Sequence, residues 1–268
     1  MADKADRADL RQRTYGRGDL AANPLFAGGF INFGYWAGIP LDGDLTVEHR
    51  IASQETLYDV VLDALGVGTG DRVLEVGSGR GLGARRILRR DPAHVRGVDL
   101  VPEQVARATE ANDDPRAAFV QGSSDDLPFP DASFDALLSV EAAQHFEDIG
   151  GFAHESARVL APGGRFAVTT FFTRTDDAGA RLAELLRTFA SGLDLAHRID
   201  DVLRDLRAAG FVDVTARSVG EHVWPGFDRW IALTEHPNGW GRNWIRAAET
   251  GLADYFLVTA RKPAGSEA

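Results

Sequence analysis

The sequence predicts an α/β fold built on a doubly wound, mostly parallel sheet, and two observations support that class. A buried-strand run ends at Val76, is followed by Gly77, Gly79 and Gly81, and leads into a helical pattern from Leu82. A strand, a tight glycine turn and a helix N-terminus form the nucleotide crevice of an open α/β sheet. Strand and helix patterns then alternate along the chain, which favours parallel strands joined by helices.

Seven runs rich in apolar and β-branched residues account for the strands. They span residues 73–76, 94–100, 117–121, 134–140, 165–172, 211–219 and 254–261. Helical periodicity before the first strand is clear at Leu57, Val60, Val61, Ala64 and Leu65. A helix over residues 149–160 is expected to stop at the Pro162-Gly163-Gly164 run.

Two helical patterns follow the fifth strand, although one crossover helix would suffice. We interpret the first, at residues 182–189, as an inserted cap helix and the second, at residues 199–206, as the crossover. The segment 222–250 contains four tryptophans and is expected to be a loop. The predicted organisation is an N-terminal lid or arm at 1–50, a core at 51–172, the cap at 173–198 and the remainder of the core at 199–268.

Length and composition exclude several classes of protein. A chain of 268 residues with a net charge of -11 suits one large α/β domain and argues against binding nucleic acid through its phosphates. The chain has no cysteine and its histidines are scattered, so we expect no disulfide, no thiolate chemistry and no metal site. The charged start at 1–19 is expected to be mobile, and no apolar run approaches a signal peptide or the roughly 20 residues of a membrane span. We therefore expect a cytoplasmic protein with no membrane partner.

Asp99 ends the second strand, roughly twenty residues beyond the glycine turn. A carboxylate at that place can accept hydrogen bonds from both hydroxyls of a ribose. The alternative is that Asp99 caps the helix that starts near Pro102.

Two motifs resemble those of class I S-adenosylmethionine (SAM) methyltransferases. The G-x-G-x-G turn follows a strand that carries Glu75, whereas a dinucleotide-binding turn would have glycine in place of Leu82. Residues 121–135 resemble the D-x-x-x-L-P-F-x-D-x-x-F-D segment of the methyltransferase group that includes quinone, sterol and antibiotic-tailoring enzymes. The resemblance covers roughly residues 57–172. It implies a seven-stranded Rossmann-like sheet, SAM as cofactor and S-adenosylhomocysteine (SAH) as product.

The resemblance also implies a set of cofactor-binding positions. These are Tyr35, Gln54, Glu75, Gly77, Gly79, Gly81, Asp99, Leu100, Ser123, Ser124 and Val140. Leu100 would lie beside the adenine face, and Ser123 replaces the acid that usually binds the adenine amino group. Either the Ser123 hydroxyl accepts that hydrogen bond or Asp125 swings in.

The segment 33–36 resembles the N-terminal lid of the same group, in which an aromatic ring closes over the methionine end of SAM. A ring such as that of Tyr35 near the sulfonium would contribute about 0.5–2 kcal/mol. The alternative is that these aromatic residues fasten the N-terminal segment to the core. Ser53 and Gln54 begin the adjoining helix and are within reach of the SAM carboxylate, with helix capping as the alternative.

Glu141 and His145 follow the fourth strand, where sheets of this kind bind ligands, and are the candidate catalytic residues. A neutral imidazole could remove a proton from the acceptor, and the alternative is a first-turn helix residue without chemistry. Related sugar O-methyltransferases have an acid at the end of the fifth strand. This chain has Thr169 and Thr170 there, so a His/Asp pair is not expected.

The expected function is methyl transfer from SAM to an O or N atom, or a C atom, of an apolar small-molecule natural product in secondary metabolism. The tryptophans at 224, 230, 240 and 244 either form an apolar wall for that acceptor or pack the core. The sequence leaves open a homo-oligomer with exchanged N-terminal arms. The alternative function is a family member that binds SAM without transferring its methyl group and assists another reaction.

Overall fold

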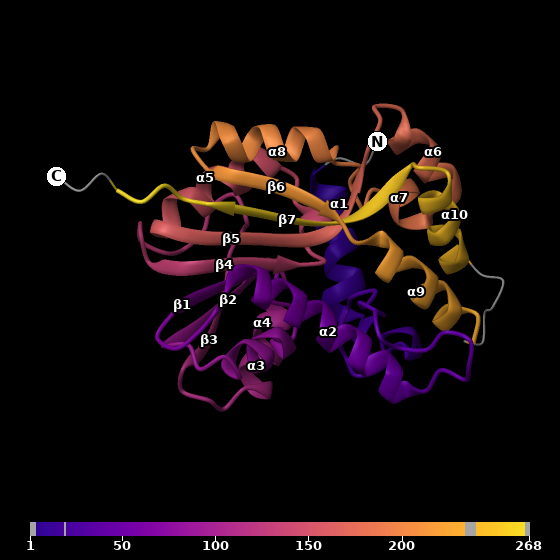
Figure 1. Cartoon of the computed structure of the whole chain (residues 1–268), viewed down its shortest axis with the longest axis horizontal. Coiled ribbons are helices and arrows are strands. Elements are labelled where there is room, and N and C mark those ends of the chain that lie inside the picture. The colour runs from indigo at the N-terminus through magenta and orange to yellow at the C-terminus, as the bar shows by residue number, and fades with distance from the viewer. Residues whose placement is uncertain (1–3, 19, 234–239, 266–268) are drawn as a thin grey trace.

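The protein is described by a computed structural model that covers residues 4–18, 20–233 and 240–265 (Figure 1). Its seven strands form one sheet in the order β3-β2-β1-β4-β5-β7-β6, with β7 antiparallel to both neighbours. The strands are β1 (Arg72–Val76), β2 (His94–Asp99), β3 (Ala117–Gln121), β4 (Phe134–Val140), β5 (Leu160–Thr173), β6 (Val212–Ser218) and β7 (Ala253–Arg261). The predicted doubly wound, mostly parallel sheet is confirmed.

Helices cover both faces of this sheet. Figure 1 shows α5 and α8 above the sheet and α2, α3 and α4 below it, while α6, α7, α9 and α10 gather at one end. The helices are α1 (Lys4–Arg11), α2 (Val47–Leu65), α3 (Leu82–Leu88), α4 (Pro102–Ala111), α5 (Ile149–Val159), α6 (Ala178–Leu185), α7 (Arg187–Ser191), α8 (Ile199–Ala208), α9 (Trp224–Ile231) and α10 (Asn243–Glu249). The strand order places β2 and β4 on opposite sides of β1, which is the switch point where such sheets bind ligands.

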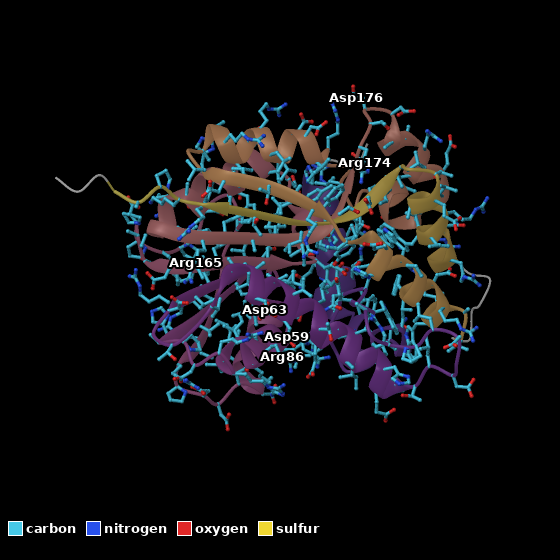
Figure 2. The ribbon with its side chains drawn as sticks, in the orientation of Figure 1. Asp59, Asp63, Arg86, Arg165, Arg174 and Asp176 are labelled. Carbon is cyan, nitrogen blue, oxygen red and sulfur yellow. The ribbon has the colours of Figure 1, made fainter. Side chains whose placement is uncertain are left out.

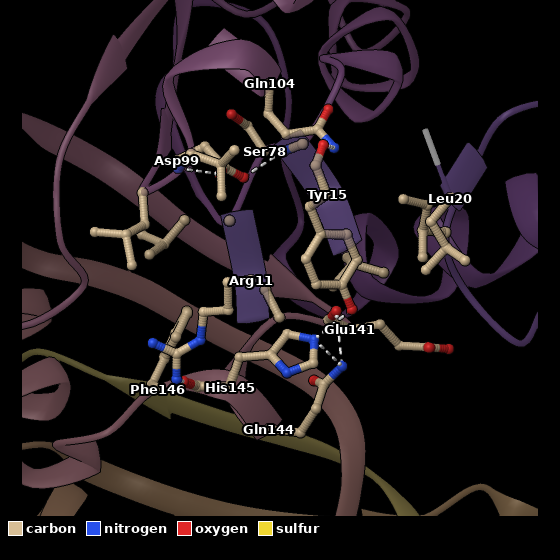
Figure 3. Close-up of a pocket in the computed structure, with 18 of the residues that line it drawn as sticks. Arg11, Tyr15, Leu20, Ser78, Asp99, Gln104, Glu141, Gln144, His145 and Phe146 are labelled. Carbon is tan, nitrogen blue, oxygen red and sulfur yellow. Dashed lines mark hydrogen bonds between the residues drawn. The ribbon is translucent and has the colours of Figure 1, made fainter. Parts of the chain in front are cut away.

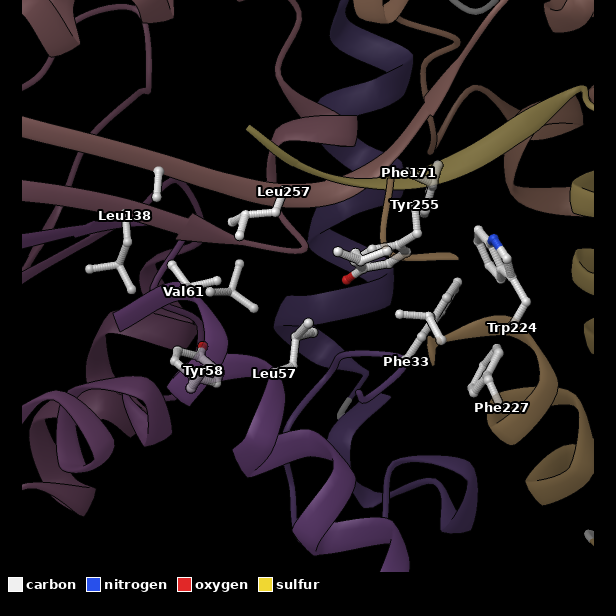
Figure 4. Packing of buried hydrophobic residues seen from close by; sticks show 14 of the residues in the cluster. Phe33, Leu57, Tyr58, Val61, Leu138, Phe171, Trp224, Phe227, Tyr255 and Leu257 are labelled. Atoms are coloured by element: carbon white, nitrogen blue, oxygen red, sulfur yellow. The ribbon is translucent and has the colours of Figure 1, made fainter. Parts of the chain in front are cut away.

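Helix α2 shows how the sequence sets the boundaries of an element. Its N-cap Thr46 accepts a hydrogen bond from the His49 N–H, and the His49 ring accepts one from the Thr46 N–H, so two free donors are satisfied. Gly66 ends the helix in the left-handed conformation, with φ of 62°. The apolar face of α2 includes Leu57 and Val61, which are fully buried against the sheet (Figure 4).

Phe33 belongs to the same core, although it comes from the N-terminal segment. Its ring stacks on Phe227 at 4.1 Å between centroids and lies 5.1 Å from Trp244. Figure 4 shows Phe33 between the end of the sheet and the C-terminal helices. The lid segment is therefore anchored by apolar packing.

Strand β5 and the cap differ from their predicted extents. Helix α5 ends at Val159, before the Pro162-Gly163-Gly164 run, which lies inside β5. Strand β5 already pairs with β4 at Leu160 before a register shift. Proline is tolerated at such irregular strand positions because no ladder hydrogen bond is required there. The cap contains two short helices, because Leu186 is extended, with φ of -125°, and interrupts the predicted single one.

The segment 222–250, expected to be a loop, contains helices α9 and α10. The loop prediction was wrong because Pro225 and Gly226 look like turn residues, whereas Pro225 occupies the first turn of α9, where proline is favourable. The start of the chain also differs from its prediction. In place of a mobile arm, α1 continues into a π-helix, η1 (Gln12–Arg17), packed on α4.

Ion pairs connect many of the surface elements (Figure 2). Arg86 on α3 pairs with Asp59 and Glu55 on α2, and Arg174 pairs with Asp254 on β7. Such partly exposed surface pairs contribute about 0–1 kcal/mol each, so burial in the core carries most of the stability. None of the helices in the part of the chain that the structure describes is long and apolar enough to cross a membrane.

Candidate active site at the switch point of the sheet

The glycine turn after β1 adopts a conformation that other residues avoid. Gly77, Gly79 and Gly81 have φ of 79°, 52° and 73°, in the left-handed region that favours glycine. A Cβ on Gly77 would lie 2.2 Å from the Cβ of Ala142, so this turn also packs against the segment after β4. The turn therefore presents bare backbone to a ligand.

Asp99 at the end of β2 faces the same turn. Its Oδ2 accepts a hydrogen bond from the Gly79 N–H and its Oδ1 one from the Val101 N–H, both at 2.9 Å. Burial raises the pKa of this carboxyl, and the two N–H groups act against that shift. A carboxylate has about four lone-pair sites, so Asp99 keeps acceptor capacity for a ribose.

These groups border a cavity of about 520 Å³, within the usual size range of a small-molecule site. Nine of the residues expected from the sequence line it: Gly77, Gly79, Asp99, Leu100, Ser123, Ser124, Val140, Glu141 and His145. Leu100 is 45% exposed, which is unusual for leucine and suits a residue that covers the face of a base. The Ser123 hydroxyl donates to Asp125, and both residues line the wall. The two residues that the sequence offers as acceptors for the adenine amino group therefore lie side by side.

Four of the expected cofactor-binding residues do not reach the cavity. Glu75 is fully buried beneath Gly83 and accepts a hydrogen bond from Tyr58 at 2.9 Å. Gly81 starts α3 and packs against Phe119. These two residues support the turn from behind.

Tyr35 and Gln54 are the other two, and both hold the lid segment in place. The Tyr35 ring lies beside the His222 ring, with 4.9 Å between centroids. The backbone N–H of Tyr35 donates to the Ser53 carbonyl. Gln54 is fully buried and donates to the Phe30 carbonyl. The lid residues that do border the cavity include Phe30, five positions before the aromatic residue expected from the sequence.

His145 lies at the end of the 3₁₀ helix η4 (Ala143–His145), at the opposite wall (Figure 3). Its Nδ1 lies 2.9 Å from the Leu193 carbonyl and 3.2 Å from Asp194 Oδ1. Because a carbonyl oxygen can only accept, Nδ1 carries the proton and Nε2 holds the lone pair. Burial lowers the pKa of His145, which favours the neutral imidazole, the form that accepts a proton.

The His145–Asp194 pair corrects the expectation that this chain lacks a His/Asp pair. Thr170, where an acid was sought, donates to the Gln144 side chain at 2.7 Å. The acid comes instead from the cap, in the segment after α7, where the Leu195 N–H donates to the Gln144 carbonyl at 2.9 Å. Burial raises the pKa of Asp194, and His145 acts against that shift.

Tyr15 and Arg11 are site residues that the sequence reasoning missed. The Tyr15 hydroxyl lies 3.0 Å from His145 Nε2, and Arg11 donates to the His145 carbonyl and to Glu147. Gln104 and Arg107 on α4 hold the Tyr15 carbonyl at 2.9 and 2.8 Å. No local pattern in the sequence singles out these two residues, and only the structure shows that Tyr15 lies in a π-helix, a form often found at functional sites.

The cavity as a whole is mainly apolar. Its wall includes Leu25, Phe26, Phe171, Phe227 and Trp244. Trp224 stacks behind Trp244 with 5.8 Å between ring centroids, and the Trp230 indole donates to the Leu25 carbonyl. One tryptophan thus borders the cavity and two pack behind it, while the side chain of the residue at position 240 lies outside the described part.

Comparisons with known proteins identify the family. Residues 74–168 match the model of a methyltransferase domain. The chain is 30% identical to 27-O-demethylrifamycin SV methyltransferase of Amycolatopsis mediterranei, over 87% of this chain and 90% of that protein. It is 34% identical to erythromycin 3''-O-methyltransferase of Saccharopolyspora erythraea, over 76% of this chain and 69% of that protein. Among solved structures, the [4+2]-cyclase SpnF matches with a TM-score of 0.72 and 26% identity, over 95% of this chain and 97% of that one.

The fold and the relatives together define an enzyme that transfers one-carbon groups. The chain belongs to the class I SAM-dependent methyltransferases, in the group that modifies small molecules, and its cofactor is SAM. The residues present fit that cofactor. Asp99 suits the ribose, and the Ser78 hydroxyl at the cavity wall is buried with no hydrogen-bond partner among the described residues. The described residues contain no group of three or more acidic or histidine side chains that could hold a metal ion.

Proposed function

We propose that this enzyme methylates a hydroxyl, or an amine, on an apolar small-molecule natural product, with His145 as the general base. The observation that carries the proposal is the buried His145–Asp194 pair in the wall of a largely apolar cavity that continues from the glycine turn. SAM supplies a methyl group on a sulfonium, which is already a strong electrophile. The protein must then hold the acceptor in line, exclude water and take one proton. Positioning of this kind is worth about 7–11 kcal/mol.

The geometry supports a separate role for each group in this proposal. Bound SAM would supply the methyl group and leave as SAH, and the proton of the acceptor oxygen would pass to His145 Nε2. Asp194 holds the Nδ1 proton and stabilises the imidazolium that forms. An acceptor hydroxyl reaches Nε2 either by taking the place of the Tyr15 hydroxyl or by bonding to it.

The test is incubation with SAM carrying an isotope-labelled methyl group and a panel of hydroxylated macrolides, polyketides and indoles. We expect label in the product, and His145→Ala should slow transfer about 10²–10⁴-fold while SAH affinity stays unchanged. The matched control is His154→Ala, because His154 is exposed on α5 and bonds only to the Gly150 carbonyl. In the wild type, kcat/KM should rise with pH through a pKa below 6.5, the usual histidine value. Full activity of His145→Ala at every pH would refute the base.

A second candidate is a reaction other than methyl transfer, with SAM bound but retained. The structural similarity to SpnF, a [4+2]-cyclase, supports this second candidate. The same incubation separates the two, because a cyclase would change its substrate without gaining label. The curated relatives that cover most of the chain are methyltransferases, which supports the first candidate.

A further inference from the structure

Glu141 occupies an unusual position directly after β4. Its backbone has φ of 47°, a value that residues other than glycine seldom adopt. Its N–H is fixed to the Thr169 carbonyl at 2.8 Å. The side chain is only 8% exposed and lies in the wall of the cavity close to His145 (Figure 3). The chain therefore holds this carboxyl group at the acceptor side of the site.

The two oxygens of Glu141 have different surroundings. Oε1 accepts hydrogen bonds from the Phe33 N–H and, at 2.6 Å, from the Tyr255 hydroxyl. Oε2 makes no hydrogen bond to any of the described residues. It is nevertheless accessible to solvent, unlike the buried polar atoms that lack a partner. Oε2 is thus the oxygen left open to the cavity.

The charges around Glu141 come from several elements. Arg50 on α2 is fully buried and donates to the carbonyls of Phe33, Asn32 and Leu25, so the Phe33 peptide lies between its guanidinium and the carboxyl. The negative charge of Asp194 also acts on Glu141 and raises its pKa. Burial raises the pKa of Glu141 to about 8, with Arg50 and the hydrogen bonds from Tyr255 and Phe33 acting against that shift.

A carboxyl group that holds a proton must carry it on one oxygen. Oε1 already accepts from two donors and has no room for a proton between them. The proton therefore belongs on Oε2, where it points to the acceptor. A neutral carboxyl in an apolar site is an effective hydrogen-bond donor.

We propose that Glu141 donates a hydrogen bond from Oε2 to a lone-pair oxygen of the acceptor, a carbonyl, ether or hydroxyl, and so orients it toward His145. This inference rests on the proposed function and narrows the acceptor to an oxygenated molecule with a second oxygen near the methylated group. Glu141 is then a binding and positioning residue, and His145 remains the base.

The experiment uses full-length protein saturated with SAH and the ketone 2-undecanone as an acceptor probe. Its affinity is measured by calorimetry at about pH 6.5 and about pH 9.5, on either side of the Glu141 pKa. The variants are Glu141→Gln, Glu141→Leu and, as a matched control, Glu75→Gln. Glu75 is also a buried carboxyl with a raised pKa but lies outside the cavity wall. In Glu141→Gln the amide oxygen can keep both donors, so the NH₂ group takes the Oε2 position.

We expect the wild type and Glu75→Gln to lose about three- to tenfold in ketone affinity at the higher pH, the range of one neutral hydrogen bond. Glu141→Gln should bind as tightly as the wild type at low pH and show no pH dependence. Glu141→Leu should bind weakly at both values. Infrared spectra should show a protonated-carboxyl band that Glu141→Gln lacks, which tests the proposal even if Glu141→Leu does not fold.

Equal ketone affinity in wild type, Glu141→Gln and Glu141→Leu would overturn the proposal. The same holds if the infrared spectra show Glu141 ionised throughout, as a counter-charge to Arg50. In both cases the protein would still bind SAH, so the proposed function would stand. Failure of the wild type to bind SAH would instead refute the proposed function, and this inference with it.

Discussion

Glu75 is a buried carboxyl group that links folding stability to pH. Glu75 is fully buried at the end of β1, with Tyr58 on one oxygen and no partner for Oε2 among the described residues. Burial raises its pKa from 4.5 to about 8, and the hydrogen bond from Tyr58 acts against that shift. An acid that ionises more readily in the unfolded chain than in the folded one favours unfolding once the pH passes 4.5.

We therefore expect Glu75→Gln to lessen the pH dependence of folding stability. The contribution of Glu75 to wild-type folding stability should be fully present below pH 4.5 and be lost as the pH rises toward about 8. The fall amounts to at most about 1.4 kcal/mol per pH unit for one group. Glu75→Gln should keep the bond to Tyr58 and lose this contribution. Urea unfolding at several pH values measures it, and identical profiles for wild type and variant would show that Glu75 is ionised when folded.

Residues of the site were predictable where they stand beside a strand end. Asp99 is the last residue of β2 and His145 follows β4, and the strand pattern alone brings such positions to one edge of the sheet. Asp194 and Tyr15 come from segments far away in sequence, 49 and 130 positions from His145 by residue number. Their meeting depends on tertiary packing, which no local pattern in the chain encodes.

At the scale of elements, the glycine turn can be tested apart from the fold. Gly79 has φ of 52° and open space where a side chain would begin, and so has Gly163, with φ of 77°, inside β5. Gly79→Arg and Gly163→Arg should therefore impose similar backbone strain, of order 1–3 kcal/mol. Only Gly79→Arg places a side chain in the cavity wall, so it alone should abolish SAH binding in calorimetry. Equal binding by both variants would mean that the cofactor does not lie along this turn.

The N-terminal segment Lys4–Arg17 should behave as a closed cover held by α4. Arg107 donates to the carbonyls of Tyr15 and Gly16, and such charge-assisted bonds are worth about 1.5–3 kcal/mol. Arg107→Ala should speed amide hydrogen exchange in Gln12–Arg17 by about tenfold or more. The control is Arg116→Ala, whose partners Asp91 and Asp114 lie away from the cover. Similar exchange in both variants would show that α4 does not hold it.

Elements with strong periodicity were predictable, whereas the short helices of the cap and of the segment 222–250 were not. Helix α2 has nineteen residues and buries a regular apolar face over its second half, from Leu57 to Leu65. Helices α7 and α10 have five and seven residues and exist because the cap and the end of the sheet pack around them. Short helices are marginal without tertiary contacts, so sequence alone cannot place them.

For the whole molecule, ligand binding should show in global stability. A ligand that binds only the folded protein, at one hundred times its Kd, adds about 2.7 kcal/mol. For a chain of this length that raises Tm by roughly 5–10 °C. We expect SAM and SAH to produce this shift and nicotinamide dinucleotides to produce none, because Leu82 stands where their turn has glycine. A shift with the dinucleotide alone would contradict the cofactor assignment.

The Phe33 peptide also bears on how the product leaves. The Phe33 N–H donates a hydrogen bond to Glu141, and the Phe33 carbonyl accepts one from Arg50. The Phe33 ring stacks on Phe227. Phe33 is therefore held in a fixed position on one side of the cavity. The cover, Lys4–Arg17, is held mainly by polar contacts and is the part that can open. We expect SAH to exit past Tyr15, so release of product also uncovers the base for the next acceptor and couples the two halves of the catalytic cycle.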